Sequence, residues 1–285
     1  MASRSSPHIA PIGPVPFKDT EQVTDDLPEV SSYVLGVPLP LSALPSSLLA
    51  GQAEMKQLYY QGFWLPEALA AGAVPLQQRF EPRPDDVIVA SLPKCGTTWV
   101  NALAFAVMAR RTYNPLTAAD HPLLRLSPHE CVPFLEGLFS PGHEARLDAL
   151  PVRRGDLPAT LDSVCNGDSW YGPFWEHVLG YWRASRGDSA VLFLRYEELL
   201  RDPARELRKL ARFVGQPFSR AEEDAGVVLG IVQLCSLQSL RGLEDSRSAG
   251  GGVVDPRLNH MTPEMARRVD GIVADRFAAS GLAFD

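Results

Sequence analysis

The stretch DDVIVASLPKCGTTWVNALAFAVMAR, residues 85–110, decides how the fold of this chain is interpreted. It starts as an apolar segment typical of a buried strand, passes through a short turn and continues into an apolar helix. The first N–H groups of a helix have no partner within it, and the aligned peptide dipoles place positive charge there. Gly96 lets the backbone approach an anion closely. Thr97 and Thr98 add hydroxyl donors and Lys94 adds a full positive charge, so the stretch predicts a phosphate-binding turn.

The order of these residues separates the turn from a Walker A loop, which has the pattern G-x-x-x-x-G-K-[ST]. Here Lys94 precedes Gly96, and no glycine stands upstream of it at the required spacing. An ATPase or GTPase is therefore disfavoured. A phosphate-transferring kinase ranks last, because no Ser or Thr follows the lysine where it would bind magnesium. An ordinary strand-turn-helix, in which Gly and Thr only cap the helix, is the weaker alternative.

The segment Pro93–Trp99, P-K-C-G-T-T-W, resembles the 5′-phosphosulfate loop of cytosolic sulfotransferases, which take the sulfuryl group from 3′-phosphoadenosine 5′-phosphosulfate (PAPS). Other stretches resemble the plant soluble branch of this family: residues 58–80, 127–138, 170–182, 191–203 and 259–270. From the first of these stretches to the last, the resemblance extends over about three quarters of the chain. The resemblance implies sulfuryl transfer from PAPS to a hydroxyl of a small acceptor, such as a flavonoid, a steroid or a hydroxyjasmonate. This chemistry requires no metal.

The resemblance also assigns roles to single residues. It implies that the donor is held by Lys94, Cys95, Gly96, Thr97, Thr98 and Trp99, by Tyr196 and Ser236 on the nucleotide side, and by Gly252. Lys94 would stabilise the leaving phosphate. His129 would lie toward the acceptor and is the best surviving candidate for a catalytic base, although plain loop structure is the favoured interpretation of this residue. For Ser236, capping of its own helix is as well supported as ligand binding.

Two segments of the family pattern are missing. The T-H-[LIM]-P segment with the catalytic histidine and the following Arg and Ser for the 3′-phosphate are not in this sequence. The family's R-K-G-x-x-G-D-W-[KR]-N-H is replaced by GGGVVDPRLNH at residues 250–260, which keeps only the third glycine and Asn-His. Arg247 or Arg257 could substitute for the lost Arg-Lys pair, but a glycine-rich surface loop is the better interpretation. The departures predict impaired activity; a catalytically inactive remnant or binding protein is the alternative.

The predicted fold class is α/β, and the resemblance implies a three-layer, P-loop-like sulfotransferase fold with a central parallel sheet that lacks central strands. Strands are expected around residues 87–92 and 190–195, because both segments are apolar enough for burial on two faces. Helices are expected from Pro203 and from Pro263, each after a capping Asp or Thr. The aromatic face of residues 170–182 is expected to be core, with His177 as an ordinary helix residue.

The domain organisation is predicted from composition. Residues 1–45 are expected to form a mobile extension, because they are rich in Pro and Ser and then acidic. Residues 46–285 are expected to form a single domain, in which 140–169 is irregular and marks a deletion site, since it shows neither helical nor strand periodicity.

Composition restricts the partners. The chain has 285 residues, 45% of them hydrophobic, and a net charge of −7, which argues against nucleic-acid and anionic membrane surfaces. Its four cysteines are widely spaced, so neither a zinc site nor a disulfide framework is indicated. No signal peptide or membrane span is evident. We therefore expect a cytoplasmic protein with a small-molecule partner and no metal, while the oligomeric state stays open.

Overall fold

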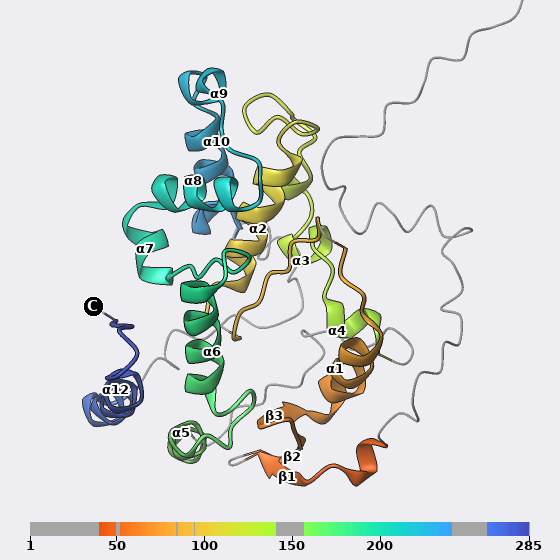
Figure 1. The fold of residues 1–285 in the computed structure, drawn as a ribbon, viewed down its shortest axis with the longest axis vertical. Coiled ribbons are helices and arrows are strands. Elements are labelled where there is room, and N and C mark those ends of the chain that lie inside the picture. Colours follow the sequence, from red (N-terminus) through yellow and green to blue (C-terminus); the bar gives the residue numbers. More distant parts are fainter. Residues whose placement is uncertain are drawn as a thin grey trace, which may run out of the picture. The chain divides into compact units, whose positions relative to one another are not determined.

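The computed structural model describes residues 40–49, 52–83, 85–93, 95–140, 157–240 and 261–284 (Figure 1). These residues divide into two compact units. Within the described ranges, the first unit contains residues 87–133 and 194–240, and the second contains residues 40–86, 134–193 and 261–284. The single domain over 46–285 and the mobile extension over 1–45 stay predictions.

The first unit is helical in the part of the chain that the structure describes. Its elements are α2 (Thr97–Ala109), η3 (Pro122–Leu124), α3 (Pro128–Cys131), α7 (Tyr196–Arg201), α8 (Pro203–Phe213), α9 (Arg220–Asp224) and α10 (Val227–Leu234). Helix α2 packs against α8 and α10, and these three helices lie together in Figure 1. Their buried side chains form the core: Leu103, Phe105 and Val107 from α2, Leu207 and Ala211 from α8, and Val228 and Ile231 from α10. A helix that is apolar on nearly all sides, as α2 is, requires such enclosure.

The C-terminal end of α2 is followed by a buried cation, Arg110. The side chain of Arg110 is 1% exposed, and its Nε donates to Glu222 Oε1 at 2.7 Å. Its two terminal nitrogens donate to the carbonyl oxygens of Val107 and Pro217, at 2.8 and 3.0 Å. The guanidinium also lies over the ring of Phe218, 4.7 Å from its centroid. Because each of the three guanidinium nitrogens donates a hydrogen bond, Arg110 ties α2 to the segment that enters α9.

The second unit contains a three-stranded antiparallel sheet in the order β1-β2-β3. Its strands are β1 (Ser46–Leu49), which follows η2 (Leu41–Ala43), β2 (Gln52–Tyr60) and β3 (Phe63–Pro66). The β2–β3 hairpin pairs Tyr60 with Phe63 and turns through Gln61 and Gly62, at φ +48° and +95°. Positive φ at both central residues is the geometry of a two-residue hairpin turn, and glycine adopts it without strain.

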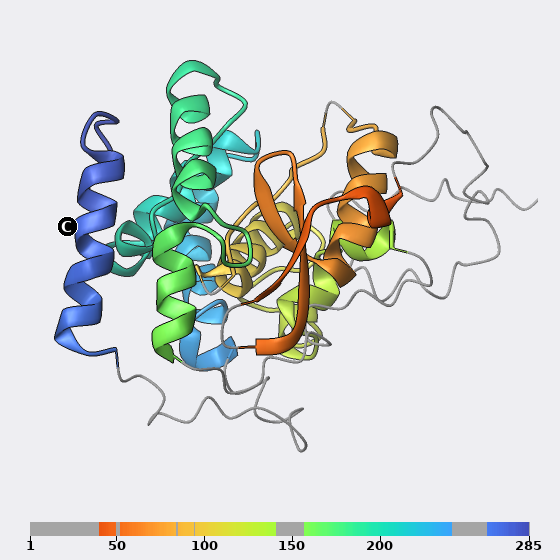
Figure 2. The ribbon, with the colours of Figure 1, turned by 90° about the horizontal axis from the view of Figure 1, so that it is seen from below.

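The helices of the second unit are α1 (Glu67–Arg79), α4 (Leu135–Leu138), α5 (Leu157–Asn166), α6 (Phe174–Gly187) and α12 (Pro263–Phe277). Helix α12 packs against α5 and α6, and Figure 2 shows it beside both. Trp175 and Leu179 of α6 form a buried cluster with Phe277 and Leu282, which confirms the predicted aromatic core. His177 stacks on Phe63 at a centroid distance of 3.8 Å, and burial lowers its pKa, as suits a packed helix residue.

Two predicted helices have their predicted starts. The carboxylate of Asp202 accepts the N–H of Arg205 at the start of α8, and the hydroxyl of Thr262 accepts the N–H of Met265 at the start of α12. In both helices proline occupies the first position, where its missing N–H costs nothing. The local capping chemistry was therefore sufficient to predict both starts.

The predicted central parallel sheet is not present among the described residues, where the strands are the three antiparallel ones above. The segments 87–92 and 190–195 carry no strand, and the prediction for them is wrong. Ile88 is 54% exposed rather than buried on two faces. The physical reason is that apolar composition favours burial, whereas a strand also requires a neighbouring strand to bond its backbone groups.

The prediction of irregular chain over 140–169 is also wrong in part. Residues 157–166 form α5, whereas 141–156 lie outside the described residues. Leu157, Leu161 and Val164 recur at helical spacing, and Pro158 is compatible with a first helical turn. The short apolar stripe was obscured by the Pro, Gly and Asp residues before it.

We predict that Gly72→Ala destabilises the second unit. A Cβ built on Gly72 of α1 would lie 1.9 Å from the carbonyl oxygen of Glu136 in α4, so the two helices must separate. Overpacking of this kind costs about 1–3 kcal/mol. Gly180→Ala in α6 is the control, because nothing lies within 4 Å of its added Cβ and the loss of glycine should stabilise the helix by about 0.5–1 kcal/mol. Urea unfolding of both variants measures the difference, and equal stability would contradict the close packing.

We predict an acid-sensitive contribution from Glu222. Desolvation opposes its ionisation, but hydrogen bonds from Arg110 and Ser219 outweigh this and lower its pKa from 4.5 to about 2. A carboxyl whose pKa is lowered by folding stabilises the fold above its unfolded pKa, and this stabilisation is lost as the pH falls from about 5 toward 2. Its size is about 2–3 kcal/mol, since the side chain is 25% exposed.

Glu222→Gln keeps an amide for the capping box of α9 and removes only the charge beside Arg110. We expect the free energy of unfolding to fall by about 2–3 kcal/mol at pH 7, and the gap to close toward pH 2. Glu223→Gln is the matched control, because Glu223 pairs with Arg208 at the surface and should contribute at most about 1 kcal/mol. A gap of constant size across the pH range would refute the assignment.

Candidate functional site

The predicted anion-binding turn is at the start of α2. Gly96 is the N-cap residue, with φ +91° and ψ 20° in the left-handed region. Within the described residues no side chain caps this helix start, so the first N–H groups of α2 remain available for a ligand. The N–H of Val100 closes the first helical turn on the carbonyl oxygen of Gly96 at 3.0 Å. Lys94 lies outside the described residues.

An aromatic pair, Trp99 and Tyr196, packs beside the turn. Tyr196, the first residue of α7, packs edge-on against the buried Trp99, with ring centroids 5.8 Å apart and an interplanar angle of 78°. A Cβ built on Gly96 would lie 3.0 Å from Cδ2 of the Tyr196 ring. The tyrosine ring therefore contacts the turn, and Tyr196 remains 38% exposed. The structure brings together three of the predicted residues here.

Two hydroxyl groups at the helix start have defined partners. Thr97 Oγ1 lies 2.5 Å from Ser91 Oγ, and Thr98 Oγ1 lies 3.1 Å from Nε2 of His129 in α3. His129 thus reaches the turn from the short helix α3, so the favoured sequence interpretation of this residue as plain loop structure is wrong. Its role as a base stays a prediction. Ser91 was missed by sequence reasoning, although a hydroxyl residue between an apolar segment and a phosphate turn was a usable signal.

Cys95 is exposed and lies in the turn itself. Protein atoms around its sulfur desolvate it, and the carboxylate of Glu197 adds a like charge, so both raise the pKa of the thiol. At neutral pH it stays protonated, which argues against a thiolate nucleophile. The part that Cys95 takes in donor binding stays a prediction.

Ser236 bonds locally. Its Oγ accepts the N–H of Ser239 at 3.2 Å and lies 2.8 Å from the Oγ of Ser239. This is the pattern of a hydroxyl that caps its own helical turn, one of the two interpretations open from the sequence. Contact with a nucleotide stays a prediction for Ser236. Gly252 lies outside the described residues.

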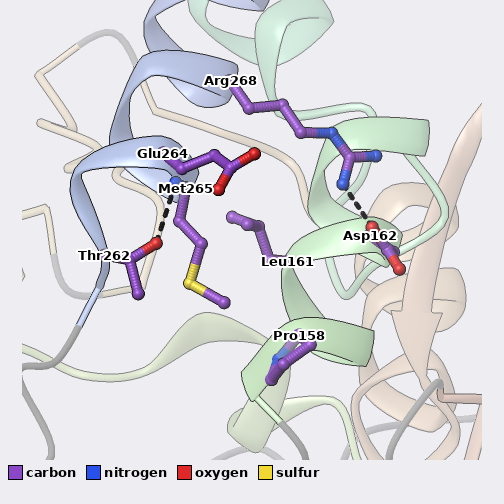
Figure 3. A pocket seen from close by; sticks show the side chains of 7 residues that line it. All are labelled: Pro158, Leu161, Asp162, Thr262, Glu264, Met265 and Arg268. Atoms are coloured by element: carbon purple, nitrogen blue, oxygen red, sulfur yellow. Dashed lines mark hydrogen bonds and ion pairs between the residues drawn. The ribbon is translucent and has the colours of Figure 1, made fainter.

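A separate pocket of about 250 Å³ lies in the second unit, between α5 and α12. Its lining residues are Pro158, Leu161, Asp162, Thr262, Glu264, Met265 and Arg268 (Figure 3). Figure 3 shows Arg268 directed toward Asp162, with which it forms an ion pair. None of the predicted site residues lines this pocket.

The described residues lack two further features. They contain no group of three or more His, Cys, Asp or Glu side chains that could hold a metal ion. In the same residues no helix is both long and apolar enough to cross a membrane.

Comparison with known proteins decides the family. The sequence model of the sulfotransferase domain matches residues 84–154 and 143–281, which include the turn, Tyr196 and Ser236. The chain belongs to the sulfotransferase family. This sulfotransferase is 34% identical to cytosolic sulfotransferase 8 of Arabidopsis thaliana, over 85% of this chain and 91% of the relative. It is 31% identical to flavonol 4′-sulfotransferase of Flaveria chlorifolia, over 78% of this chain and 88% of the relative.

Solved structures agree on the fold. A crystal structure of an Arabidopsis thaliana sulphotransferase aligns with a TM-score of 0.67 at 28% identity, over 86% of this chain and 94% of that chain. Retinol dehydratase, solved with androsterone and the inactive cofactor PAP, aligns with a TM-score of 0.54 at 17% identity, over 86% and 93% of the two chains. The solved structures that resemble this chain have the α/β sulfotransferase fold. As a member of the family, the chain is classed with the PAPS-dependent sulfotransferases.

We predict that Gly96→Ala damages the turn in two ways. The positive φ costs an alanine about 1–2 kcal/mol, and the added Cβ meets the Tyr196 ring. Gly226→Ala is a matched control, because Gly226 is also a helix N-cap with φ +80° and ψ 18°, but nothing lies within 4 Å of its Cβ. Thermal unfolding should show a larger loss for Gly96→Ala. An equal loss in both variants would show that Tyr196 does not restrict the turn.

Proposed function

We propose that this chain transfers the sulfuryl group of PAPS to a hydroxyl of a small acceptor, at a rate reduced by the loss of an internal segment. The observation that carries the proposal is the turn itself. Gly96 opens α2 in a left-handed conformation, the first N–H groups are uncapped by any described side chain, and the Tyr196 ring lies against the turn. A helix start of this kind binds the oxygens of a phosphate or sulfate group.

The proposed chemistry is an in-line transfer. The bond between the sulfur and the 5′-phosphate oxygen of PAPS breaks while the acceptor oxygen bonds to sulfur, and the acceptor hydroxyl gives up its proton. Lys94 would stabilise the charge on the leaving phosphate, with donors from the turn at Gly96–Trp99. This differential stabilisation of developing charge is the main contribution that such a site makes.

The relatives support an internal shortening. The match to the first relative runs over 306 positions, yet 85% of this 285-residue chain is about 242 residues, so about 64 positions face no residue here. The Flaveria bidentis flavonol sulfotransferase-like protein gives about 63, from 285 positions and 78% of the chain. The family match is divided into two stretches that overlap at residues 143–154. We place the missing positions there, outside the described residues.

The shortening predicts which functions are weakened. In the family pattern this region carries the catalytic histidine and residues that bind the 3′-phosphate. Each charge-assisted hydrogen bond contributes about 1.5–3 kcal/mol, so loss of two would weaken donor binding about a hundredfold or more. Loss of a general base typically costs about 10²–10⁴ in rate. The turn would then hold the 5′ end of the donor with little help from the 3′ end.

The acceptor class follows from the relatives. Several are flavonol sulfotransferases by name, and we propose a flavonoid as the first acceptor to test, with steroids and hydroxyjasmonates next. Because the curated relatives are named cytosolic, we also propose a cytoplasmic location. The alternative, a non-catalytic binding protein, predicts donor binding without turnover of any acceptor.

The first test compares two nucleotides by calorimetric titration: 3′-phosphoadenosine 5′-phosphate (PAP) and adenosine 5′-phosphate. We expect both to bind, with dissociation constants within about tenfold of each other, because the bonds to the 3′-phosphate are missing. Lys94→Ala should weaken both. Arg111→Ala, an exposed cation just beyond the other end of α2, is the control for general charge effects and should change neither.

The outcomes separate the parts of the proposal. Absence of binding by a folded sample contradicts the donor site. A preference for PAP of a hundredfold or more contradicts the loss of 3′-phosphate binding and directs attention to Arg247 and Arg257. Transfer of labelled sulfate from PAPS to a flavonol supports the enzyme, and binding without transfer supports the non-catalytic alternative.

A further inference from the structure

The contact between Thr98 and His129 suggests how the donor turn is organised. Thr98 is the second residue of α2, and its Oγ1 lies 3.1 Å from Nε2 of His129. The inference rests on the proposed function, because it concerns the same donor site. It assigns to His129 a role different from that of a base.

The backbone that carries His129 is held in place. Helix α3 begins with a capping box, in which the N–H of Ser127 donates to Oε2 of Glu130 at 2.8 Å. Pro128 and Cys131 are buried on either side of the exposed histidine, and α3 packs against α2. An exposed side chain on such an anchored turn is presented to its partner at a fixed distance.

The hydrogen bond between the two side chains can run in either direction. If the Thr98 hydroxyl donates to Nε2, its oxygen lone pairs face the ligand and repel an anion. If Nε2 carries a proton and donates to Oγ1, the hydroxyl proton can be given to the ligand. The direction of this hydrogen bond must be set from outside α2, because residues 97–109 contain no ionisable side chain that could orient the Thr98 hydroxyl toward an anion.

We propose that His129 is a positioning residue for the donor: its Nε2–H donates to Thr98 Oγ1, so that the Thr98 hydroxyl donates to an anionic oxygen of PAPS. A general base needs a lone pair on the nitrogen that takes the proton. In this arrangement Nε2 already carries a proton, so this nitrogen serves donor binding rather than proton abstraction.

The test is a double-mutant cycle of PAP binding, measured by titration calorimetry on the full chain. His129→Ala removes the hydrogen-bond donor to Thr98 and should weaken PAP binding about threefold to tenfold. Thr98→Val should weaken PAP binding at least as much. Because His129 acts through Thr98, the double variant should bind no more weakly than Thr98→Val alone. His129→Gln retains an N–H donor and should recover most of the wild-type affinity.

A spectroscopic measurement reports on the proton directly. Long-range ¹H–¹⁵N correlation spectra of the imidazole distinguish a protonated from an unprotonated Nε2. Addition of PAP should shift His129 toward the form protonated at Nε2, and should not do so in Thr98→Val. A purely structural histidine would show no such response.

Each remaining outcome overturns the inference or supports it. Additive losses in the cycle, or no shift of the imidazole nitrogens, overturn it. Arg125→Ala is the charge control, because this exposed cation donates to the carbonyl oxygen of Asp120. If it lowers PAP affinity as much as His129→Ala does, the loss reflects general electrostatics and the inference is overturned. If the wild-type chain does not bind PAP, the proposed function fails as well. If it binds PAP and His129→Ala binds equally well, only the role of His129 fails. If the melting temperatures of the variants are unchanged, a loss of PAP affinity arises at the site and not from unfolding.

Discussion

The backbone conformation at Gly96 is the constraint on which the site depends. A residue with φ +91° can open α2 without a side-chain cap, and a Cβ at this position would make a tight contact with the Tyr196 ring, 3.0 Å from its Cδ2. The same two facts keep the first N–H groups of the helix accessible. The conformation of the turn is thus decided by the missing side chain at residue 96, and the neighbouring side chains only adjust it.

Behind the turn, α2 is enclosed by α8 and α10, and its far end is fixed by the buried guanidinium of Arg110. The helix is therefore anchored at the end opposite the turn. Since α2 is held by packing and by this ion pair, the direction of its N–H groups does not depend on a ligand. Such preorganisation is what allows a helix start to bind an anion without a further ordering cost.

Sequence reasoning predicted those features that are decided locally. The turn that opens α2 follows from the Gly-Thr-Thr pattern at residues 96–98, the starts of α8 and α12 follow from Asp202 and Thr262, and the aromatic core follows from the spacing around Trp175. The features that depend on distant partners were not predictable. Residues 87–92 have the composition of a strand but no strand beside them, and the partnership of Thr98 with His129 joins residues 31 apart in the sequence.

The absence of ionisable side chains from α2 separates ligand affinity from folding stability in this chain. The helix supplies backbone dipoles and two hydroxyls, so the full charges that bind a donor must come from the segments around it. Charges borne by loops can be lost or exchanged without disturbing the packed helix. Substitution of such a charge would then change ligand affinity while leaving the stability of the packed helix nearly unchanged.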